Sequence, residues 1–322
     1  MIFSTLLFFA ASLDTPALQR DFDQLAKGFK GRVGVCVSAE GKFVCLNPDQ
    51  KFSIQSVVKM MVGMTVLDAV DSKGWSLETK LRIYKKDLSV SRQPLADLVG
   101  PDGFETTIGD LVRRANVDSD SAACDILIDR LGGVAVLQDF INRKGIRGMR
   151  IDRDERFLQS NTAGLTWHPE YVAPKIFDAA RAAIPEAKRS EAWLSYKNDP
   201  RDTSTPTAML DLLDKLVRGK LLSPKSTAFL MSVMEQCTTA EDRLTASLNP
   251  GWRLGHRSGT SGTWKGLSIA TNDVGFLRAP DGSIILIAVF VADSTESNDR
   301  NAAMIANLAR ASIRRTRLNP SK

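Results

Sequence analysis

Two residues three positions apart, Ser56 and Lys59, are the first candidates for chemistry in this chain. They lie in an apolar run, 56–64, whose length and content favour a buried helix. Residues i and i+3 share one face of a helix, so the hydroxyl and the amine would meet. A serine beside a desolvated amine is a candidate nucleophile, because its proton has an acceptor. The same pattern also fits a buried helix whose lysine extends to solvent.

The composition limits the other chemistry that is available. The chain has 322 residues, 43% hydrophobic and 25% charged, as in ordinary globular proteins. Its two histidines, His168 and His256, stand in no setting typical of a Ser-His-Asp triad or of a zinc site. Hydrolysis would therefore use a lysine or a carboxylate as base, and no metal or organic cofactor is expected.

The charge pattern bears on possible partners. The net charge is +6, and the basic residues are scattered apart from an arginine cluster at 310–317. Without a basic stripe interleaved with aromatics, nucleic-acid binding is not expected, whereas a small anionic substrate is compatible. No segment after the N-terminus has the run of about 20 apolar residues that crosses a bilayer. Nothing in the sequence demands an oligomer, so we expect a monomer.

The hydrophobic patterns predict an α+β fold. Strands are expected near both ends of the chain and helices in the middle, with one helical stretch at 107–131. We predict an antiparallel sheet flanked by helices, built from both termini, with an inserted all-helical domain. The expected division is a sheet domain at 13–52 and 237–322, a helical domain at 53–236, and within it an extended loop at about 155–205.

The cysteines and the N-terminus bear on the cellular compartment in which the protein folds. Two short strands joined by a two-residue turn would place Cys36 opposite Cys45, and either a disulfide or two free core cysteines fits. Cys124 and Cys237 are interpreted as buried, small apolar residues. Residues 1–12 resemble the apolar core of a secretory signal, which predicts a periplasmic or secreted protein. A packed N-terminal segment is the alternative, because no Lys or Arg precedes the apolar core.

Three polar clusters accompany the Ser–Lys pair. They are Ser119-Asp120-Ser121, the segment 153–159 with 199–206 downstream, and the segment 255–262. In this order and spacing they resemble class A serine β-lactamases, whose motifs are Ser-x-x-Lys, Ser-Asp-Asn and Lys-Thr-Gly. The resemblance runs from about residue 20 to 310, nearly the whole chain.

The resemblance implies catalytic roles. Ser56 would attack the lactam carbonyl, and Lys59 would help to remove its proton. Glu155 would activate the water that hydrolyses the acyl-enzyme, and Ser119 would relay a proton to the leaving nitrogen. The backbone N–H groups of Ser56 and Thr260 would hold the oxyanion.

It also implies residues around these groups. Arg153 and Asp202 would form the ion pair that closes the loop carrying Glu155. Residues in contact with the substrate, whose carboxylate needs positive charge beside it, would be Ser121, Gln159, Arg243, Arg257, Ser258 and Thr260.

The chain departs from the family pattern at four positions. Ser121 and Gln159 stand where Asn is usual, and a shorter or longer side chain would alter the contacts to substrate and water. Arg257 replaces the usual Lys, which keeps the charge but changes its shape. Asp125 replaces an Asn, as in an extended-spectrum subgroup. Its carboxylate would lie near the loop of Glu155, and a shared proton could hold that loop.

The segment between Glu155 and Asp199 is the largest departure, roughly thirty residues longer than the family norm, and loops of this length are usually functional or disordered. Its aromatic content argues against disorder, and a helix is expected at about 173–183. The alternatives to a β-lactamase are a D-alanyl-D-alanine carboxypeptidase or esterase, or a penicillin-binding relative that does not hydrolyse. Glu155 and the Arg153–Asp202 pair argue against the carboxypeptidase. Glu155 is also the residue that separates hydrolysis from trapping, because enzymes of this kind without an acidic base stall as acyl-enzymes.

Overall fold

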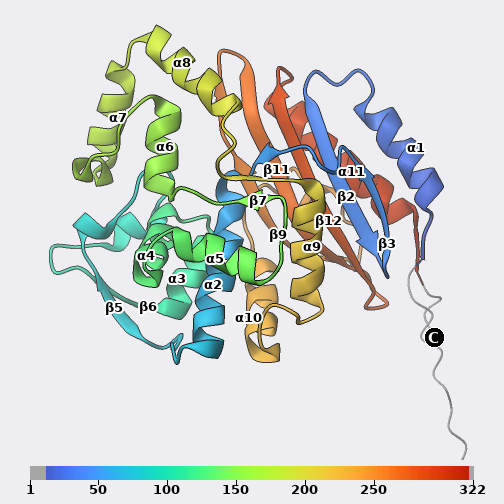
Figure 1. Cartoon of the computed structure of the whole chain (residues 1–322), viewed down its shortest axis with the longest axis horizontal. Helices are drawn as coiled ribbons and strands as arrows, with labels where there is room; N and C mark the ends of the chain where they lie inside the picture. Colours follow the sequence, from blue (N-terminus) through green and yellow to red (C-terminus); the bar gives the residue numbers. More distant parts are fainter. Residues whose placement is uncertain (1–11, 319–322) are drawn as a thin grey trace, which may run out of the picture.

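A six-stranded antiparallel sheet forms the centre of the computed structural model, which describes residues 12–318 (Figure 1). Its strands come from both ends of the chain: β2 (Arg32–Ala39), β3 (Lys42–Leu46), β9 (Arg253–Thr260), β10 (Thr263–Trp264), β11 (Leu267–Arg278) and β12 (Ile284–Ser294). The order is β10-β11-β12-β2-β3, and β9 also pairs with β11. The predicted α+β fold with a sheet built from both termini is confirmed.

The central strand β12 explains why the sheet has helices on both faces. Successive side chains of a strand point to opposite faces. Ile287 and Val289 belong to the apolar cluster on one side of the sheet, and Ala288 and Phe290 to the cluster on the other. All four are fully buried, so both faces of the strand must be covered.

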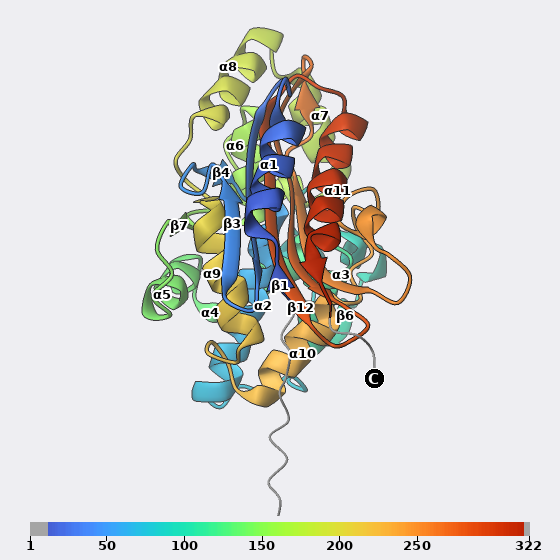
Figure 2. The same cartoon turned by 90° about the vertical axis from the view of Figure 1, so that its right-hand side faces the viewer.

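Helices from the two ends of the chain cover one face. These are α1 (Thr15–Ala26) and α11 (Asn298–Arg314), which lie side by side over the sheet (Figure 2). Two short strands, β1 (Ser12–Leu13) and β13 (Thr316–Arg317), pair with each other and join the ends of the described chain. On the opposite face, helices of the central part of the chain pack against β2, β9 and β12.

That central part is mainly helical. Its helices are α2 (Val58–Ser72), α3 (Ile108–Val117), α4 (Ser121–Leu131), α5 (Ala135–Arg143), α6 (Glu155–Ala163), α7 (Pro174–Ala183), α8 (Glu186–Lys197), α9 (Pro206–Val217) and α10 (Pro224–Met234). A short strand, β4 (Phe52–Ser53), precedes them, and four more lie between them: β5 (Lys80–Ile83), β6 (Phe104–Thr107), β7 (Met149–Arg150) and β8 (Thr203–Ser204). Single 3₁₀ turns complete it: η1 (Gln55–Val57), η2 (Lys85–Asp87), η3 (Pro94–Leu98), η4 (Pro169–Val172) and, after α10, η5 (Thr245–Ser247).

The prediction of a single helical stretch at 107–131 is wrong. The chain forms α3 and α4 with a break between them, where Ser119 has a positive φ of 61°. Asp120 then caps α4, because its side chain accepts a hydrogen bond from the backbone N–H of Ala123 at 2.9 Å. The break turns the Ser119 side chain out of the helical register.

The long segment after α6, residues 164–198, is called the extension below. It contains the predicted helix, here α7, and a second helix, α8, which extend beyond α6 (Figure 1). Trp193 and Tyr196 of α8 pack with Leu158 of α6 and Ile269 of β11. Trp193 also donates a hydrogen bond from Nε1 to the Leu267 carbonyl at 3.1 Å. The extension is therefore anchored on the sheet.

The four cysteines have three different environments. Cys36 and Cys45 are opposite each other in the β2–β3 register and form a disulfide, so the first of the two alternatives holds. Cys124 is buried, as predicted. Cys237 was expected to be a buried apolar residue, but it is only half-buried and contacts polar groups.

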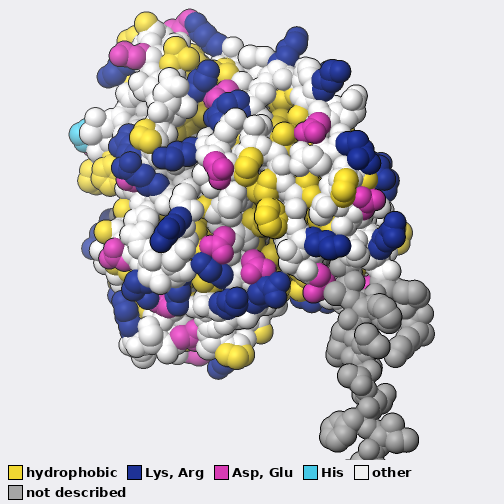
Figure 3. All heavy atoms as spheres, turned by 45° about the vertical axis from the view of Figure 1, so that its right-hand side comes forward, with side chains coloured by type: hydrophobic (Ala, Val, Ile, Leu, Met, Phe, Trp, Pro, Cys, Tyr) yellow, Lys and Arg dark blue, Asp and Glu magenta, His cyan; other side chains and the backbone are white. Residues whose placement is uncertain are grey.

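Residues 1–11 of the predicted signal segment lie outside the described residues. No helix of the part that the structure describes is long and apolar enough to cross a membrane. On the face drawn in Figure 3, Lys and Arg side chains are dispersed among Asp and Glu rather than gathered in a stripe.

Candidate active site

Ser56 lies in the tight turn η1 that leads into α2, not in the α-helix itself. Gln55 before it has a positive φ of 48°. Asn272 of β11 donates a hydrogen bond to the Ser53 carbonyl at 2.7 Å and fixes the entry to the turn. Strand β9 runs so close that a Cβ on Gly259 would lie 2.5 Å from the Ile54 carbonyl oxygen. Only glycine permits this approach, which brings β9 beside the serine.

Lys59 and Glu155 meet at the Ser56 hydroxyl. The Lys59 Nζ donates to Ser56 Oγ at 2.9 Å and to Glu155 Oε1 at 2.7 Å. Ser56 Oγ lies 3.4 Å from the same carboxylate oxygen. Lys59 is fully buried, and a third hydrogen bond to Ser121 Oγ at 3.3 Å completes its partners. The predicted i, i+3 pair is thus formed, and the alternative of a lysine that extends to solvent is wrong.

The electrostatics favour an ionised Glu155. Burial by itself would raise the pKa of this carboxyl. The charge and the hydrogen bond of Lys59 outweigh burial and, with smaller contributions from Gln159 and Arg257, hold the pKa below its ordinary value. At neutral pH Glu155 is therefore an acceptor beside the serine hydroxyl.

Asp125 holds the backbone on which Glu155 stands. Its two carboxylate oxygens accept hydrogen bonds from the backbone N–H groups of Glu155 at 2.9 Å and Arg156 at 3.1 Å. Burial first, and then the charge of Asp154, raise the pKa of Asp125 well above its ordinary value. Among the described residues no hydrogen bond joins the carboxyl groups of Asp125 and Glu155. Asp125 therefore clamps the backbone that carries Glu155, and the shared proton stays a prediction.

The ion pair predicted to close this loop is present. Arg153 Nε lies 2.6 Å from Asp202 Oδ2, and both side chains are buried. The other oxygen of Asp202 accepts from the backbone N–H groups of Asp152 at 2.7 Å and Arg153 at 3.0 Å. Asp199 adds a second carboxylate, 3.1 Å from the same guanidinium.

Arg257 requires a correction. It was expected to meet the substrate carboxylate, but it is fully buried and does not line the cleft. Its guanidinium donates to the carbonyls of Ser56 at 3.1 Å and Asn116 at 3.2 Å, and it contacts Ser119 Oγ closely. These three acceptors occupy the fork of the side chain. Arg257 therefore positions Ser119 and the serine turn.

Arg243 supplies the cationic side chain at the far wall of the cleft. Its guanidinium donates to Thr260 Oγ1 at 2.6 Å and to the Gly259 and Asn272 carbonyls. Its Nε is buried without a hydrogen-bond partner in the described part of the chain. Ser258 Oγ lies 2.9 Å from Thr239 Oγ1 on the same wall.

These groups open into one cleft of about 580 Å³. The predicted residues that line it are Ser56, Ser119, Ser121, Glu155, Gln159, Arg243, Ser258 and Thr260. Gln159 bridges its floor, because Nε2 donates to Glu155 Oε2 at 3.2 Å and to Gln55 Oε1 at 3.3 Å. Lys59, Asp125, Arg153, Asp202 and Arg257 stand behind this surface and support it.

A hydrogen-bond network around the serine turn was not predicted from the sequence. The Tyr196 hydroxyl makes close contacts with Ser53 Oγ and Gln55 Nε2. Burial raises the pKa of this phenol to about 12, so it remains protonated. The aromatic content of the extension was the only signal for Tyr196, and it did not indicate what the ring would contact.

A second missed group lies behind β9. His256 Nδ1 lies 2.8 Å from Asp273 Oδ1, and both residues are buried. Burial alone would raise the pKa of the neighbouring Cys237 thiol. His256 and Arg257 outweigh burial and lower the pKa to about 7. No sequence motif joined these three residues.

The geometry supports acyl transfer to a serine. A nucleophilic hydroxyl, an ionised carboxylate and an ammonium are within hydrogen-bond reach, as this chemistry requires. A second hydroxyl, Ser119, and a cationic wall face the same cleft. The arrangement can accept a proton, donate a proton and hold an anionic substrate.

Comparison with known proteins gives the same result. A sequence model described as the β-lactamase enzyme family matches residues 17–316. The β-lactamase VEB-1 of Pseudomonas aeruginosa is 29% identical over 313 residues, which are 96% of this chain and 93% of that protein. The extended-spectrum β-lactamase PER-1 of the same organism is 30% identical over 304 residues, 94% of this chain and 88% of that protein.

Solved structures agree. A β-lactamase from Chitinophaga pinensis superimposes with a TM-score of 0.76 at 29% identity, covering 91% of this chain and 97% of that one. A class A β-lactamase from Bacteroides cellulosilyticus gives a TM-score of 0.77 at 26% identity, covering 94% of this chain and 98% of that one.

Proposed function

We propose that this chain, which belongs to the β-lactamase enzyme family and hydrolyses β-lactams, does so with Ser56 as nucleophile and Glu155 as general base. One observation carries the assignment: Ser56 Oγ lies 2.9 Å from Lys59 Nζ and 3.4 Å from Glu155 Oε1. Lysine donates to both oxygens, so the serine proton has the carboxylate as its acceptor.

Acylation follows from this donor pattern. Ser56 Oγ bonds to the lactam carbonyl carbon as its proton passes to Glu155, directly or through a water. The backbone N–H groups of Ser56 and Thr260 hold the oxyanion, a type of contact worth a few kcal/mol. The close packing of β9 on the serine turn, which Gly259 permits, supports this pairing.

The lactam nitrogen then leaves the carbonyl carbon, and water hydrolyses the ester. Ser119, held by Arg257, gives a proton to the lactam nitrogen as the ring C–N bond breaks. The proton that Glu155 took from Ser56 passes on by way of Lys59 to restore the Ser119 hydroxyl, so Glu155 is ionised again. Glu155 then takes a proton from a water whose oxygen attacks the ester carbonyl, and it returns this proton to Ser56 Oγ as the ester C–O bond breaks. The wall of Arg243, Ser258 and Thr260 would hold the substrate carboxylate.

Penicillins, and cephalosporins with them, are the proposed substrates. The carboxypeptidase and trapping alternatives are not favoured, because Glu155 is ionised and in contact with the nucleophile. We further propose a periplasmic or secreted monomer. The internal disulfide Cys36–Cys45 is typical of oxidising compartments.

Two variants test the assignment. Ser56→Ala should abolish the mass increase that benzylpenicillin gives on the intact protein, because the nucleophile is gone. Glu155→Gln should still be labelled, more slowly, because Lys59 remains beside Ser56 Oγ to take up its proton. It should lose deacylation by about 100-fold or more, so that the acyl-enzyme accumulates. Glu170→Gln, an exposed carboxylate of the extension, is the control and should turn over like the parent. Parent-like turnover by Glu155→Gln would contradict the assignment of the base.

A further inference from the structure

A second cavity, of about 200 Å³, opens beside the reactive cleft. The two spaces share five lining residues: Ser91, Gln159, Arg181, Ser261 and Gly262. Gln159 also hydrogen-bonds Glu155, so the cavity begins next to the catalytic carboxylate. A molecule attached to Ser56 could therefore extend into it.

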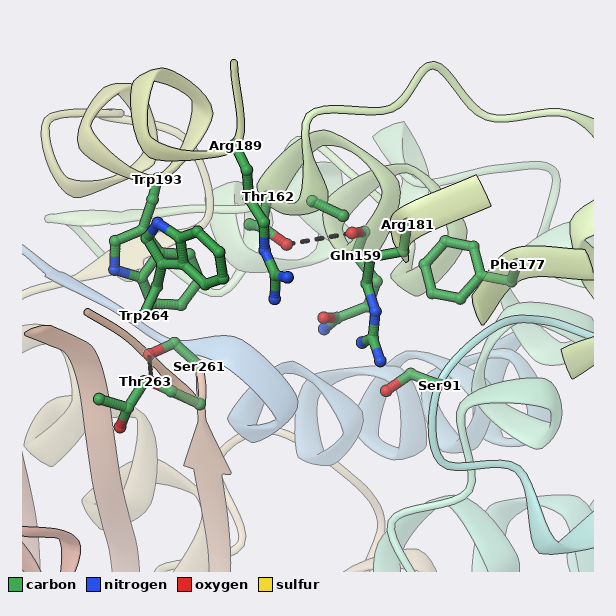
Figure 4. Close-up of a pocket in the computed structure, with 12 residues that line it drawn as sticks. Ser91, Gln159, Thr162, Phe177, Arg181, Arg189, Trp193, Ser261, Thr263 and Trp264 are labelled. Carbon is green, nitrogen blue, oxygen red and sulfur yellow. Dashed lines mark hydrogen bonds between the residues drawn. The ribbon is translucent and has the colours of Figure 1, made fainter. Parts of the chain in front are cut away.

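The extension builds most of the roof of this cavity. Phe177 and Arg181 come from α7, and Arg189 and Trp193 come from α8 (Figure 4). Both guanidinium groups point down from the roof toward the space between the walls (Figure 4). This part of the cavity depends on the segment by which the chain is longer than its family pattern.

The roof is cationic. The residues that line the cavity include two arginines and no Asp or Glu. No ion pair of Arg189 is formed within the described residues, and its guanidinium instead lies 3.7 Å from the centre of the Trp264 ring. Arg181 has one exposed partner, Asp178, at 3.3 Å.

The neighbouring carboxylates do not neutralise this roof. Glu155 is paired with Lys59, and Glu186 with Lys265. Burial, and then the like charge of Arg181, lower the pKa of Arg189. An anion bound between these two cations would offset their repulsion.

The walls of the cavity are aromatic. Trp264 and Trp193 stand on one side and Phe177 on the other (Figure 4). Trp264 is held by a hydrogen bond from Nε1 to Ser190 Oγ at 3.1 Å, so its ring has a fixed place. Planar rings bury apolar area against such walls, while a guanidinium binds a carboxylate in a bidentate manner.

We propose that this cavity binds the acyl substituent of the substrate and favours β-lactams whose substituent carries an aromatic ring and a second anionic group. The proposal rests on the proposed function, because it assumes that Ser56 holds the lactam carbonyl. The ring carboxylate then lies toward Arg243 and Thr260, and the acyl substituent extends in the opposite direction, past Gln159. Arg181 and Arg189 would be specificity-determining residues for that substituent.

The test uses a matched substrate pair, benzylpenicillin and its α-carboxy derivative, which differ by one carboxylate. The measured quantity is the ratio of kcat/KM for the carboxylated to the parent compound. In the variant Arg181→Gln/Arg189→Gln this ratio should fall about tenfold. In the parent enzyme the ratio should also fall as the salt concentration is raised, because salt screens the two arginines. Arg181→Lys/Arg189→Lys should retain part of the preference, because the charge remains.

Lys188→Gln is the matched control. Lys188 is an exposed cation on α8 next to Arg189, but it does not line the cavity. Its removal should leave the ratio and the parent activity unchanged. A ratio that stays within twofold in the double Gln variant, or that falls equally in Lys188→Gln, would overturn the proposal.

Failure of the proposed function is distinguishable. If the enzyme does not hydrolyse benzylpenicillin, that function is wrong, and the cavity is then tested by calorimetric titration of the Ser56→Ala variant with both compounds. Tighter binding of the carboxylated compound, lost in the double Gln background, supports the cavity. Equal binding overturns it. If inorganic phosphate at millimolar concentration abolishes the preference, the cavity is a general anion site and the substituent selectivity is overturned.

Discussion

The contact of Lys59 with Ser56 could be predicted from spacing alone, but its other contacts could not. Its spacing from Ser56 predicted the contact, since helix geometry brings i and i+3 together. Its third partner, Ser121, and its counter-charge, Glu155, come from α4 and α6. Those distances depend on tertiary packing, and only the resemblance of whole motifs indicated them.

Arg257 marks where residue-level prediction failed. The side chain is the right type for a substrate carboxylate, and its motif is adjacent to Thr260 on β9. The side chain nevertheless turns inward, because the Ser56 and Asn116 carbonyls offer it two acceptors. No local pattern reveals which carbonyls a guanidinium will find.

The buried pair of His256 and Asp273 should make stability depend on pH. Burial would lower the pKa of His256, but the charge and hydrogen bond of Asp273 outweigh it and raise the pKa to about 10 from 6.5. The protonated form is favoured by folding, so this contribution is complete below pH 6.5 and is lost as the pH rises toward 10. The neighbouring Cys237 thiol interacts with the same imidazole, and its pKa of about 7 lies between the two pH values compared, so the comparison is made in a Cys237→Ala background.

The variant His256→Gln should therefore lose more free energy of unfolding at pH 6 than at pH 10, measured by urea denaturation at both values. His168→Gln, which removes an exposed histidine, should show no such difference. An equal loss for His256→Gln at both pH values would mean that the ion pair contributes nothing to folding.

At the scale of elements, α8 supports the serine turn from outside the usual motifs. Tyr196 reaches Ser53 and Gln55, and Gln55 itself has a positive φ. A non-glycine residue with positive φ persists only where its surroundings enforce it, at a cost of about 1–3 kcal/mol. The hydroxyl of Tyr196 is part of that enforcement.

Tyr196→Phe should lower the free energy of unfolding by about 1–3 kcal/mol, because it leaves two buried polar groups without their shared partner. It should also lower kcat for benzylpenicillin, since Ser56 follows Gln55 directly. Tyr171→Phe is the matched control in the same extension, where the ring packs on Phe177. If Tyr171→Phe lowered the free energy of unfolding and kcat as much as Tyr196→Phe does, the Tyr196 hydroxyl would have no special role at the serine turn.

Elements with strong local signals were predictable. The β2–β3 hairpin is one, because Glu40 and Gly41 both adopt the positive φ that its two-residue turn needs. The break between α3 and α4 was not predicted, because the apolar spacing typical of a helix is present on both sides of Ser119 and Asp120 and conceals the interruption. The docking of the extension on β10 and β11 also lay beyond the sequence, because it depends on surfaces that only the folded sheet presents.

At the scale of the whole molecule, the disulfide ties an edge strand to the sheet. Reducing Cys36–Cys45 should cost about 2 kcal/mol or less, because the bridge closes a short loop that the hairpin already constrains. Thermal denaturation with and without a reductant measures the loss as a decrease in Tm. The variant Cys36→Ala/Cys45→Ala should melt at one temperature in both conditions. A reductant effect that persists in it would point to the free thiols instead.

The place of β12 in the sheet has a consequence for how the protein is made. This strand lies between β11 and β2, so the N-terminal hairpin has no neighbour to pair with until nearly the whole chain has left the ribosome. Contacts between such distant segments are slow to form, and an unpaired strand edge invites association with other chains. Until β12 is in place, the unpaired edge of the hairpin is therefore open to association with other copies of the chain. The sheet is complete only when β12 joins the N-terminal hairpin to β9, β10 and β11.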